Sequence, residues 1–253
     1  CIEEALNKNV KFLVFPELSI SSYTCGDLFL NSSLLNASLK GLESIVNKSI
    51  GKDMLIAVGC PLLHNNVLYN CAYLIFEGTV LGIVPKSYIP NYSEFYEKRW
   101  FTEGRNIKDE KVNLPFQSDV PLGTNLIFTS GEFKFGIEIC EDLWVTIPPS
   151  SYLSLAGANI IGNLSASNEL VSKKDYRKSL ISNQSARCIS SYIYSSAGVH
   201  ESTTDLLFSG HLIISENGSI IKENSRFQRD NEVITSSIDI FKPSHSFFIV
   251  DTV

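Results

Sequence analysis

Short apolar runs separated by glycine, asparagine and serine recur along the chain and predict many β-strands. The runs are rich in β-branched and aromatic residues, and several alternate apolar with polar positions, which is typical of strands with a buried face. We expect strands within residues 11–15, 53–59, 66–76, 79–84, 124–130, 132–139, 158–163, 190–196, 206–215 and 231–239.

Helices and tight turns lie between these runs. Apolar residues at helical spacing predict helices at about 27–48, 148–157 and 172–190, with Ser172 as a candidate N-cap of the last. Glycine adopts positive φ readily, so a glycine between two strands indicates a hairpin turn. We expect hairpins at the dipeptides Glu77-Gly78, Ser130-Gly131 and Asn217-Gly218.

This alternation of elements predicts an α/β fold with two mixed sheets covered by helices. The hairpins join neighbouring strands directly, which argues against a purely parallel sheet. We expect a single domain over residues 1–253. The chain opens as a helix already under way, so we expect an N-terminal strand to be missing. The region 86–124 has no clear pattern, and loops of that length are generally functional.

Composition excludes several classes of function. The net charge is −6 and no long Lys/Arg run occurs, which argues against nucleic-acid or membrane-surface binding. The densest basic segment, 173–179, is interpreted as the solvated face of a helix. No apolar segment approaches the roughly 18 residues of a membrane span. The six cysteines are scattered, which favours a reduced, cytoplasmic setting, and the four dispersed histidines argue against zinc.

Three ionisable residues each follow an apolar strand: Glu17, Lys86 and Cys140. Each alone has an ordinary explanation, as a turn glutamate, a loop lysine and a buried structural cysteine. Glu141 and Asp142, directly after the cysteine, would raise its pKa and suppress the reactive thiolate. A nucleophilic thiol therefore needs a base and a cation from elsewhere, and a buried glutamate and a lysine meet that need. Together the three residues predict a Cys–Glu–Lys triad.

Four separated blocks of sequence resemble one known family. They are "FPELSISSYTCGDLF" around Glu17, "PKSYIPNYSEFYEKRWF" around Lys86, "GIEICEDLW" around Cys140, and "HESTTDLLFSGHLIISENG" at 200–218. The first three resemble the catalytic blocks of the nitrilase, or carbon–nitrogen hydrolase, superfamily. The fourth resembles the branch that forms the glutamine amidotransferase domain of glutamine-dependent NAD⁺ synthetases.

The resemblance implies a role for each residue of the triad. Cys140 would attack the side-chain amide of glutamine. Glu17 would act as general base, then as the acid that protonates ammonia, then as the base that activates water. Lys86 would stabilise the oxyanion together with the backbone N–H of Glu141.

It also implies a set of supporting and substrate-binding residues. Glu97 would be the second glutamate that positions the triad, with Glu94 as the competing candidate. Glu141 would bind the α-ammonium of glutamine, whereas Asp142 is either a polar residue opening the turn or a structural hydrogen-bonding group. We expect the pocket to be lined by Tyr23, Tyr92, Phe95 and Glu141, and by one or both of Ser165 and Ser167.

The fold implied by the resemblance is a four-layer αββα sandwich. The implied function is glutamine hydrolysis that supplies ammonia, through a tunnel, to a synthetase domain that amidates deamido-NAD. We expect that domain to lie outside this sequence, since no Gly-rich phosphate loop follows the last predicted strand before the closing "FFIVDTV". We expect no cofactor here, with ATP and Mg²⁺ confined to the synthetase domain, and a homo-oligomeric parent enzyme.

Three alternatives remain open from the sequence. The chain could be a free-standing amidase acting on another small amide, although "ESTTDL" argues against it. It could be a catalytically silent nitrilase-like scaffold, although retention of Glu17, Lys86 and Cys140 argues against that. A nucleotide-binding module is disfavoured because no GxGxxG follows any strand.

Overall fold

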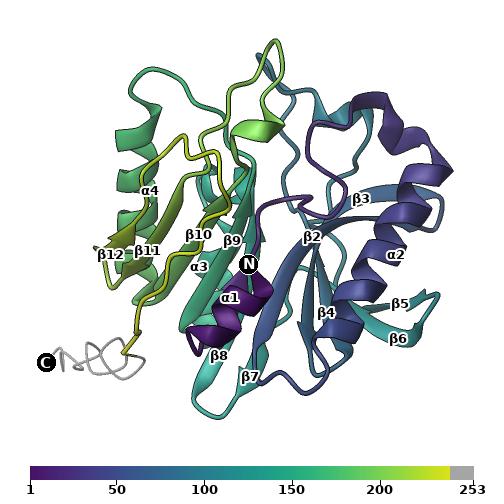
Figure 1. Cartoon of the computed structure of the whole chain (residues 1–253), viewed down its shortest axis with the longest axis horizontal. Coiled ribbons are helices and arrows are strands. Elements are labelled where there is room, and N and C mark those ends of the chain that lie inside the picture. The colour runs from purple at the N-terminus through teal and green to yellow at the C-terminus, as the bar shows by residue number, and fades with distance from the viewer. Residues whose placement is uncertain (240–253) are drawn as a thin grey trace, which may run out of the picture.

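Two six-stranded sheets stack face to face, with helices on their outer sides (Figure 1). The computed structural model describes residues 1–239. The strands of the first sheet, in spatial order, are β1 (Phe12–Val14), β2 (Leu55–His64), β3 (Val67–Phe76), β4 (Thr79–Pro85), β6 (Gln117–Leu122) and β5 (Glu110–Leu114). Those of the second are β12 (Ser219–Glu223), β11 (Leu212–Glu216), β10 (Ser191–Ser196), β9 (Ile160–Ser165), β8 (Phe133–Ile139) and β7 (Phe128–Ser130).

Within residues 1–239, four α-helices and four short 3₁₀ helices connect and cover the sheets. The α-helices are α1 (Ile2–Asn7), α2 (Ser32–Lys48), α3 (Pro149–Leu155) and α4 (Lys173–Cys188). The 3₁₀ helices are η1 (Gly26–Leu30), η2 (Glu97–Arg99), η3 (Cys140–Leu143) and η4 (Val199–Glu201). None of the helices in residues 1–239 is long and apolar enough to cross a membrane.

Both sheets are mixed, as the sequence predicted. β1 pairs with β2 and β4 with β6 in parallel, and β8, β9 and β10 are parallel neighbours. The predicted hairpins join β3 to β4, β7 to β8 and β11 to β12 in antiparallel pairs. At the turn between β3 and β4, both Glu77 (φ +47°) and Gly78 (φ +75°) adopt positive φ, which matches the right-handed twist of the strands.

Alternation along the strands separates the core into layers. Between the sheets, Ala57 and Leu74 from the first sheet pack with Ile137 and Leu164 from the second. The next side chains along each strand face the helices. Residues of α1 and α2 cover the first sheet, whereas α3 and α4 cover the second, as the outer position of α2 and α4 in Figure 1 also shows. The predicted four-layer αββα sandwich is therefore confirmed.

Two expectations about the elements were wrong, and the strand expected at 206–215 is formed only from residue 212 onward, as β11. The region 86–124 is not structureless, because it contains η2 and the β5–β6 hairpin. The segment 231–239 forms no strand. Its backbone is held by side chains instead, since Lys8 donates to the carbonyl oxygen of Val233 and Glu216 accepts from the N–H of Asp239. The closing "FFIVDTV" lies outside the described residues.

The basic segment 173–179 also differs from its prediction. Arg177 is fully buried under the second sheet, and Lys173 is half-buried, so the interpretation as a solvated face is wrong at both positions. Ser172 does occupy the N-cap position of α4, but with φ +67° and with no capping hydrogen bond from its side chain.

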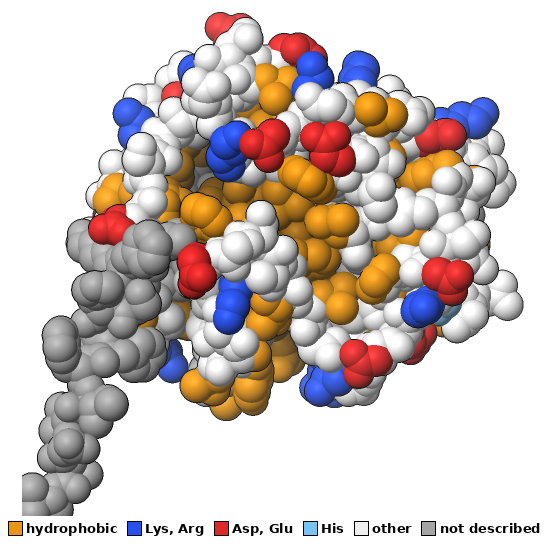
Figure 2. Space-filling model, turned by 90° about the horizontal axis from the view of Figure 1, so that it is seen from below, with side chains coloured by type: hydrophobic (Ala, Val, Ile, Leu, Met, Phe, Trp, Pro, Cys, Tyr) orange, Lys and Arg blue, Asp and Glu red, His pale blue; other side chains and the backbone are white. Residues whose placement is uncertain are grey.

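The hairpin between β7 and β8 lies at the lower end of the molecule in the view of Figure 1. Hydrophobic side chains gather near the centre of this face in Figure 2, and Phe133, in that hairpin, is 42% exposed. The residues that carry candidate chemistry follow the opposite ends of β8 and β9.

Candidate active site

The three predicted triad residues follow the carboxyl ends of three strands and meet in the interior. Glu17 comes three residues after β1, Lys86 directly follows β4, and Cys140 directly follows β8. Their exposed fractions are 2%, 1% and 5%. The backbone N–H of Glu17 donates to the carbonyl oxygen of Ser165 at the end of β9 (3.2 Å), which joins the two sheets beside these side chains.

Lys86 binds two carboxylates at once. Its Nζ lies 2.6 Å from Oε1 of Glu17 and 2.9 Å from both carboxylate oxygens of Glu97. Burial acts to lower the pKa of Lys86, but the two carboxylates outweigh burial and hold that pKa well above its usual value. Lys86 is therefore a buried, permanently charged ammonium, available to stabilise negative charge.

Of the two candidate glutamates, the structure brings Glu97 to Lys86. Glu97 is buried, and its Oε1 also accepts a hydrogen bond from the hydroxyl of Tyr23 (2.6 Å). Glu94 lies elsewhere, where it accepts from the side-chain amide of Asn168. Tyr23, predicted as a pocket residue, thus contacts the carboxylate that holds the lysine.

Glu17 has the environment of a general base. Burial raises its pKa to about 7, the nearby Glu97 carboxylate acts in the same direction, and Lys86 opposes both. Asn70, on β3, donates from its side chain to Oε1 of Glu17 (2.6 Å), and its carbonyl oxygen accepts from the N–H of Lys86 (2.8 Å). Asn70 was not among the residues predicted from the sequence, although an asparagine inside an otherwise apolar strand is a usable signal.

Cys140 sits at a strained position. It adopts φ +44°, a region that non-glycine residues rarely occupy, at the point where β8 turns into η3. Burial raises the pKa of its thiol far above the usual value, with Glu17 acting in the same direction and Lys86 opposing. The thiol therefore stays protonated until a base removes its proton, which is the task that Glu17 can perform.

Asp142 maintains this turn. Its carboxylate accepts hydrogen bonds from the backbone N–H groups of Ile139 (2.9 Å), Ser87 (3.3 Å) and Tyr88 (2.9 Å). The first of these residues precedes Cys140 and the other two follow Lys86. Asp142 thus ties the cysteine turn to the lysine loop, and of the two explanations left open by the sequence the structural hydrogen-bonding one holds.

The remaining pocket candidates divide into two groups. The hydroxyl of Tyr92 donates to the carboxylate of Glu141 (2.9 Å), and the ring of Phe95 packs edge-on against Tyr92 at 6.0 Å. The hydroxyl of Ser165 donates to Asn163, which in turn contacts Tyr192 in the layer facing α3 and α4. The side chain of Ser165 therefore points away from the space between the sheets.

Ser167 and Lys173 lie on the same stretch beyond β9. The N–H of Ser167 donates to the hydroxyl of Ser196 (3.2 Å). Nζ of Lys173 lies 5.6 Å from the ring centroid of Phe95 and 5.1 Å from that of Trp144. Burial lowers the pKa of Lys173, while the negative charge of a Cys140 thiolate would raise it. Lys173 is a cation facing the site, and nothing in its local sequence distinguished it from a surface lysine.

The protein has two mixed sheets between helix layers, and it buries a thiol, two carboxylates and an ammonium at the strand ends. These features define a class of αββα proteins built around a Cys–Glu–Lys cluster. Residues 1–241 match the family of carbon–nitrogen hydrolases. The chain belongs to this family.

Several proteins similar to this chain are glutamine-dependent NAD(+) synthetases. The chain is 40% identical over 230 residues to the glutamine-dependent NAD(+) synthetase of Mycobacterium tuberculosis, covering 89% of this chain and 33% of the relative. It is 32% identical over 249 residues to the human glutamine-dependent NAD(+) synthetase, and the match covers 94% of this chain and 35% of the human protein. A crystal structure of a glutamine-dependent NAD(+) synthetase from Cytophaga hutchinsonii superimposes with a TM-score of 0.77 at 29% identity. The match covers 89% of this chain and 36% of that structure's chain. The chain thus spans about a third of the length of the relatives it matches.

Proposed function

We propose that this domain hydrolyses the side-chain amide of glutamine through a thioester on Cys140, and that the ammonia feeds an NAD⁺ synthetase. The observation that carries the proposal is the buried contact of Lys86 with Glu17 and Glu97 beside that thiol. Its relatives' names supply the substrate, since they are glutamine-dependent NAD(+) synthetases.

The first half-reaction forms the thioester. Sγ of Cys140 attacks the amide carbon while the carboxylate of Glu17 takes the thiol proton. The carbonyl oxygen becomes an oxyanion, which the ammonium of Lys86 and the backbone N–H of Glu141 stabilise. The carbon–nitrogen bond then breaks, and Glu17 returns its proton to the departing nitrogen, so that ammonia leaves and the glutamyl group stays on sulfur.

The second half-reaction releases glutamate. Glu17, again a carboxylate, takes a proton from water as the water oxygen attacks the thioester carbon. The oxyanion forms in the same position, the carbon–sulfur bond breaks, and the proton returns to sulfur. A pKa of about 7 for Glu17 suits a group that must accept and release a proton in each half-reaction.

The charges around the pocket fit the two ends of an amino acid. Glu141, with Tyr92 bonded to it, presents a carboxylate for the α-ammonium. Lys173, whose Nζ lies over the ring of Phe95, presents a cation for the α-carboxylate. Glutamine carries both charges, whereas a simple aliphatic amide carries neither, so the pocket favours glutamine over the amides of a free-standing amidase.

Cys140→Ala in the full-length protein tests this proposal. We expect loss of glutamine hydrolysis and of glutamine-dependent NAD⁺ synthesis, with ammonia-dependent synthesis retained, because the substitution removes only the nucleophile. Cys188→Ala, at a half-buried cysteine on α4, is the matched control and should keep all three activities. Retention of glutaminase activity in Cys140→Ala, or faster hydrolysis of small aliphatic amides than of glutamine by the unsubstituted protein, would overturn the assignment.

The proposal also concerns the rest of the enzyme. We place ATP and Mg²⁺ in a synthetase domain of the same parent chain, not here, and we assign no cofactor to the glutaminase chemistry. We further propose a cytoplasmic homo-oligomer in which ammonia passes internally between the two sites. Size measurement of the full-length protein in solution tests the oligomer, and a monomer would contradict it.

A further inference from the structure

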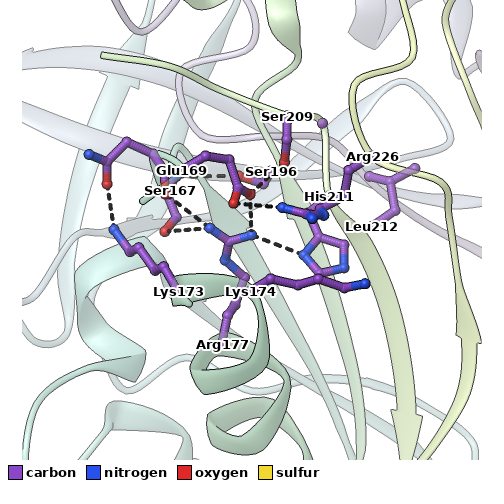
Figure 3. Close-up of polar contacts among 12 residues, drawn as sticks. Ser167, Glu169, Lys173, Lys174, Arg177, Ser196, Ser209, His211, Leu212 and Arg226 are labelled. Carbon is purple, nitrogen blue, oxygen red and sulfur yellow. Dashed lines mark hydrogen bonds and ion pairs between the residues drawn. The ribbon is translucent and has the colours of Figure 1, made fainter. Parts of the chain in front are cut away.

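Arg177, on α4, is a fully buried cation outside the Cys–Glu–Lys cluster (Figure 3). Its Nη1 lies 2.6 Å from Oε1 of Glu169, and its Nη2 donates to the carbonyl oxygen of Asn168 (3.0 Å) and to the hydroxyl of Ser167 (3.4 Å). One carboxylate compensates its charge directly, and both contacts of Nη2 are to neutral groups of one loop. Burying an ion is costly unless its hydrogen bonds are well made, so these neutral contacts make its position specific.

His211 fixes the orientation of this guanidinium. Nδ1 of His211 accepts from Nη1 of Arg177 (2.9 Å), and Nε2 contacts Glu223 (3.0 Å). Burial first, and then Arg177, lower the pKa of His211 to about 4. The ring is therefore neutral, with its proton on Nε2, so that Nδ1 is free to accept.

Glu169 extends the network to distant segments. Its carboxylate also accepts from the hydroxyl of Ser209 (2.6 Å) and from Arg226 (2.9 Å). Figure 3 shows Ser167 and Glu169, from the loop after β9, and His211, just before β11, around the guanidinium that α4 carries. The fourth block of the sequence analysis, 200–218, is thus joined to the loop after β9 through Glu169.

The loop that Arg177 holds also touches the candidate active site. The carbonyl oxygen of Ser165 accepts from the N–H of Glu17, and the N–H of Ala166 interacts with the sulfur of Cys140. Ser167 and Asn168 follow directly and are the two residues that Nη2 of Arg177 binds. One side of this short segment therefore meets the reacting groups, and the other side meets Arg177.

We propose that Arg177 is a positioning residue of the glutamine site: its guanidinium holds Ser167 and Asn168, and through them the wall of the pocket, without touching substrate. This inference rests on the proposed function for the identity of the substrate. A planar fork can bind Glu169, Asn168 and Ser167 together, whereas the ammonium of a lysine is a single point with a different reach. Arg177→Lys keeps the charge and loses this geometry.

Steady-state kinetics of the full-length protein test the inference. We expect Arg177→Lys to raise KM for glutamine about tenfold, the effect of roughly one lost hydrogen bond, with kcat within about twofold and ammonia-dependent synthesis unchanged. Protection of Cys140 from iodoacetamide should require correspondingly more glutamine. Arg187→Lys, at an exposed arginine on the same helix, is the control and should leave KM unchanged.

A double-mutant cycle separates positioning from a general structural role. Ser167→Ala should raise KM, and Arg177→Lys should add little to it, because both act through one contact. An unchanged KM in Arg177→Lys, additive effects in the cycle, or a parallel fall of kcat and ammonia-dependent activity would overturn the inference.

Two further results keep the inference separable from folding and from the proposed function. If Arg177→Lys does not fold, His211→Gln replaces it as the test. This variant leaves Arg177 in place but exchanges the acceptor that orients its guanidinium, so it should raise KM for glutamine two- to threefold, the effect of roughly half a hydrogen bond. An unchanged KM would contradict the inference. Loss of glutaminase activity in Cys140→Ala with a normal KM in these variants would refute the positioning role alone. Full activity in Cys140→Ala would refute the proposed function itself.

Discussion

Glu97→Gln should shift the pH dependence of glutamine hydrolysis, because Glu97 helps to keep Glu17 a base of near-neutral pKa. Both carboxylates contact Nζ of Lys86, at 2.6 and 2.9 Å, so their nearest oxygens lie no more than about 5.5 Å apart (2.6 plus 2.9). At an effective dielectric constant of about 20, two unit charges at that separation repel by about 3 kcal/mol. That energy corresponds to about two pH units, and screening by Lys86 reduces it.

We therefore expect the acid limb of kcat/KM to move from about pH 7 to a value about 1 to 2 pH units lower. The sign follows from charge: the substitution removes a negative neighbour, so the carboxylate of Glu17 becomes easier to form. A less basic Glu17 is a weaker proton acceptor, and kcat on the plateau should fall about tenfold.

The assay is glutamate release by the full-length protein across about pH 5 to 9, a range centred on the pKa of Glu17 of about 7. Glu94→Gln is the matched control, because Glu94 contacts Asn168 and not Lys86, and its profile should not move. An acid limb that stays in place in Glu97→Gln, or that moves to higher pH, would refute the electrostatic reasoning. An equal shift in Glu94→Gln would show that Glu97 has no special place beside the lysine.

Two predictions concern the scaffold of the site. Asp142→Ala should lower the free energy of unfolding by about 3 kcal/mol, because three buried N–H groups lose their acceptor. Urea denaturation measures this change. The control, Asp53→Ala at an exposed aspartate, should change the free energy of unfolding by less than about 0.5 kcal/mol. Gly59→Ala would place Cβ 2.1 Å from the backbone nitrogen of Leu18, so it should displace the loop that carries Glu17 and reduce glutaminase activity at least tenfold, roughly the loss from a misplaced catalytic group. Normal kinetics in a folded Gly59→Ala protein would contradict that packing argument.

The elements that repeat a local pattern were predictable from the sequence. The alternation in 132–139 and the glycine turn before it predicted β8 and its hairpin, because both properties depend on neighbouring residues only. The same reasoning failed at 231–239, whose apolar residues look like a strand but have no strand partner. β5 and β6, within 86–124, were not predicted, because these strands are more polar and the turn between them, at 115–116, contains no glycine.

The candidate site shows the same division. Strand ends and a family resemblance were enough to select Glu17, Lys86 and Cys140 from the sequence. The sequence could not decide between Glu94 and Glu97, since the two are three residues apart and only their distance to Lys86 distinguishes them. Nor did the sequence distinguish Ser165, whose side chain faces the helices, from Ser167.

The sequence by itself determined most of the strands and the three hairpin turns, because those features depend on residues within a few positions of each other. It selected Cys140 as the candidate nucleophile only through the resemblance of separated blocks to a known family. Only the tertiary structure decided which charges meet. Arg177 resembled a surface residue in a basic segment, and its burial depends on Glu169, His211 and the end of β9 arriving at one point. A buried ion is stable only with such partners, and partners brought together from distant elements leave no pattern in the local sequence.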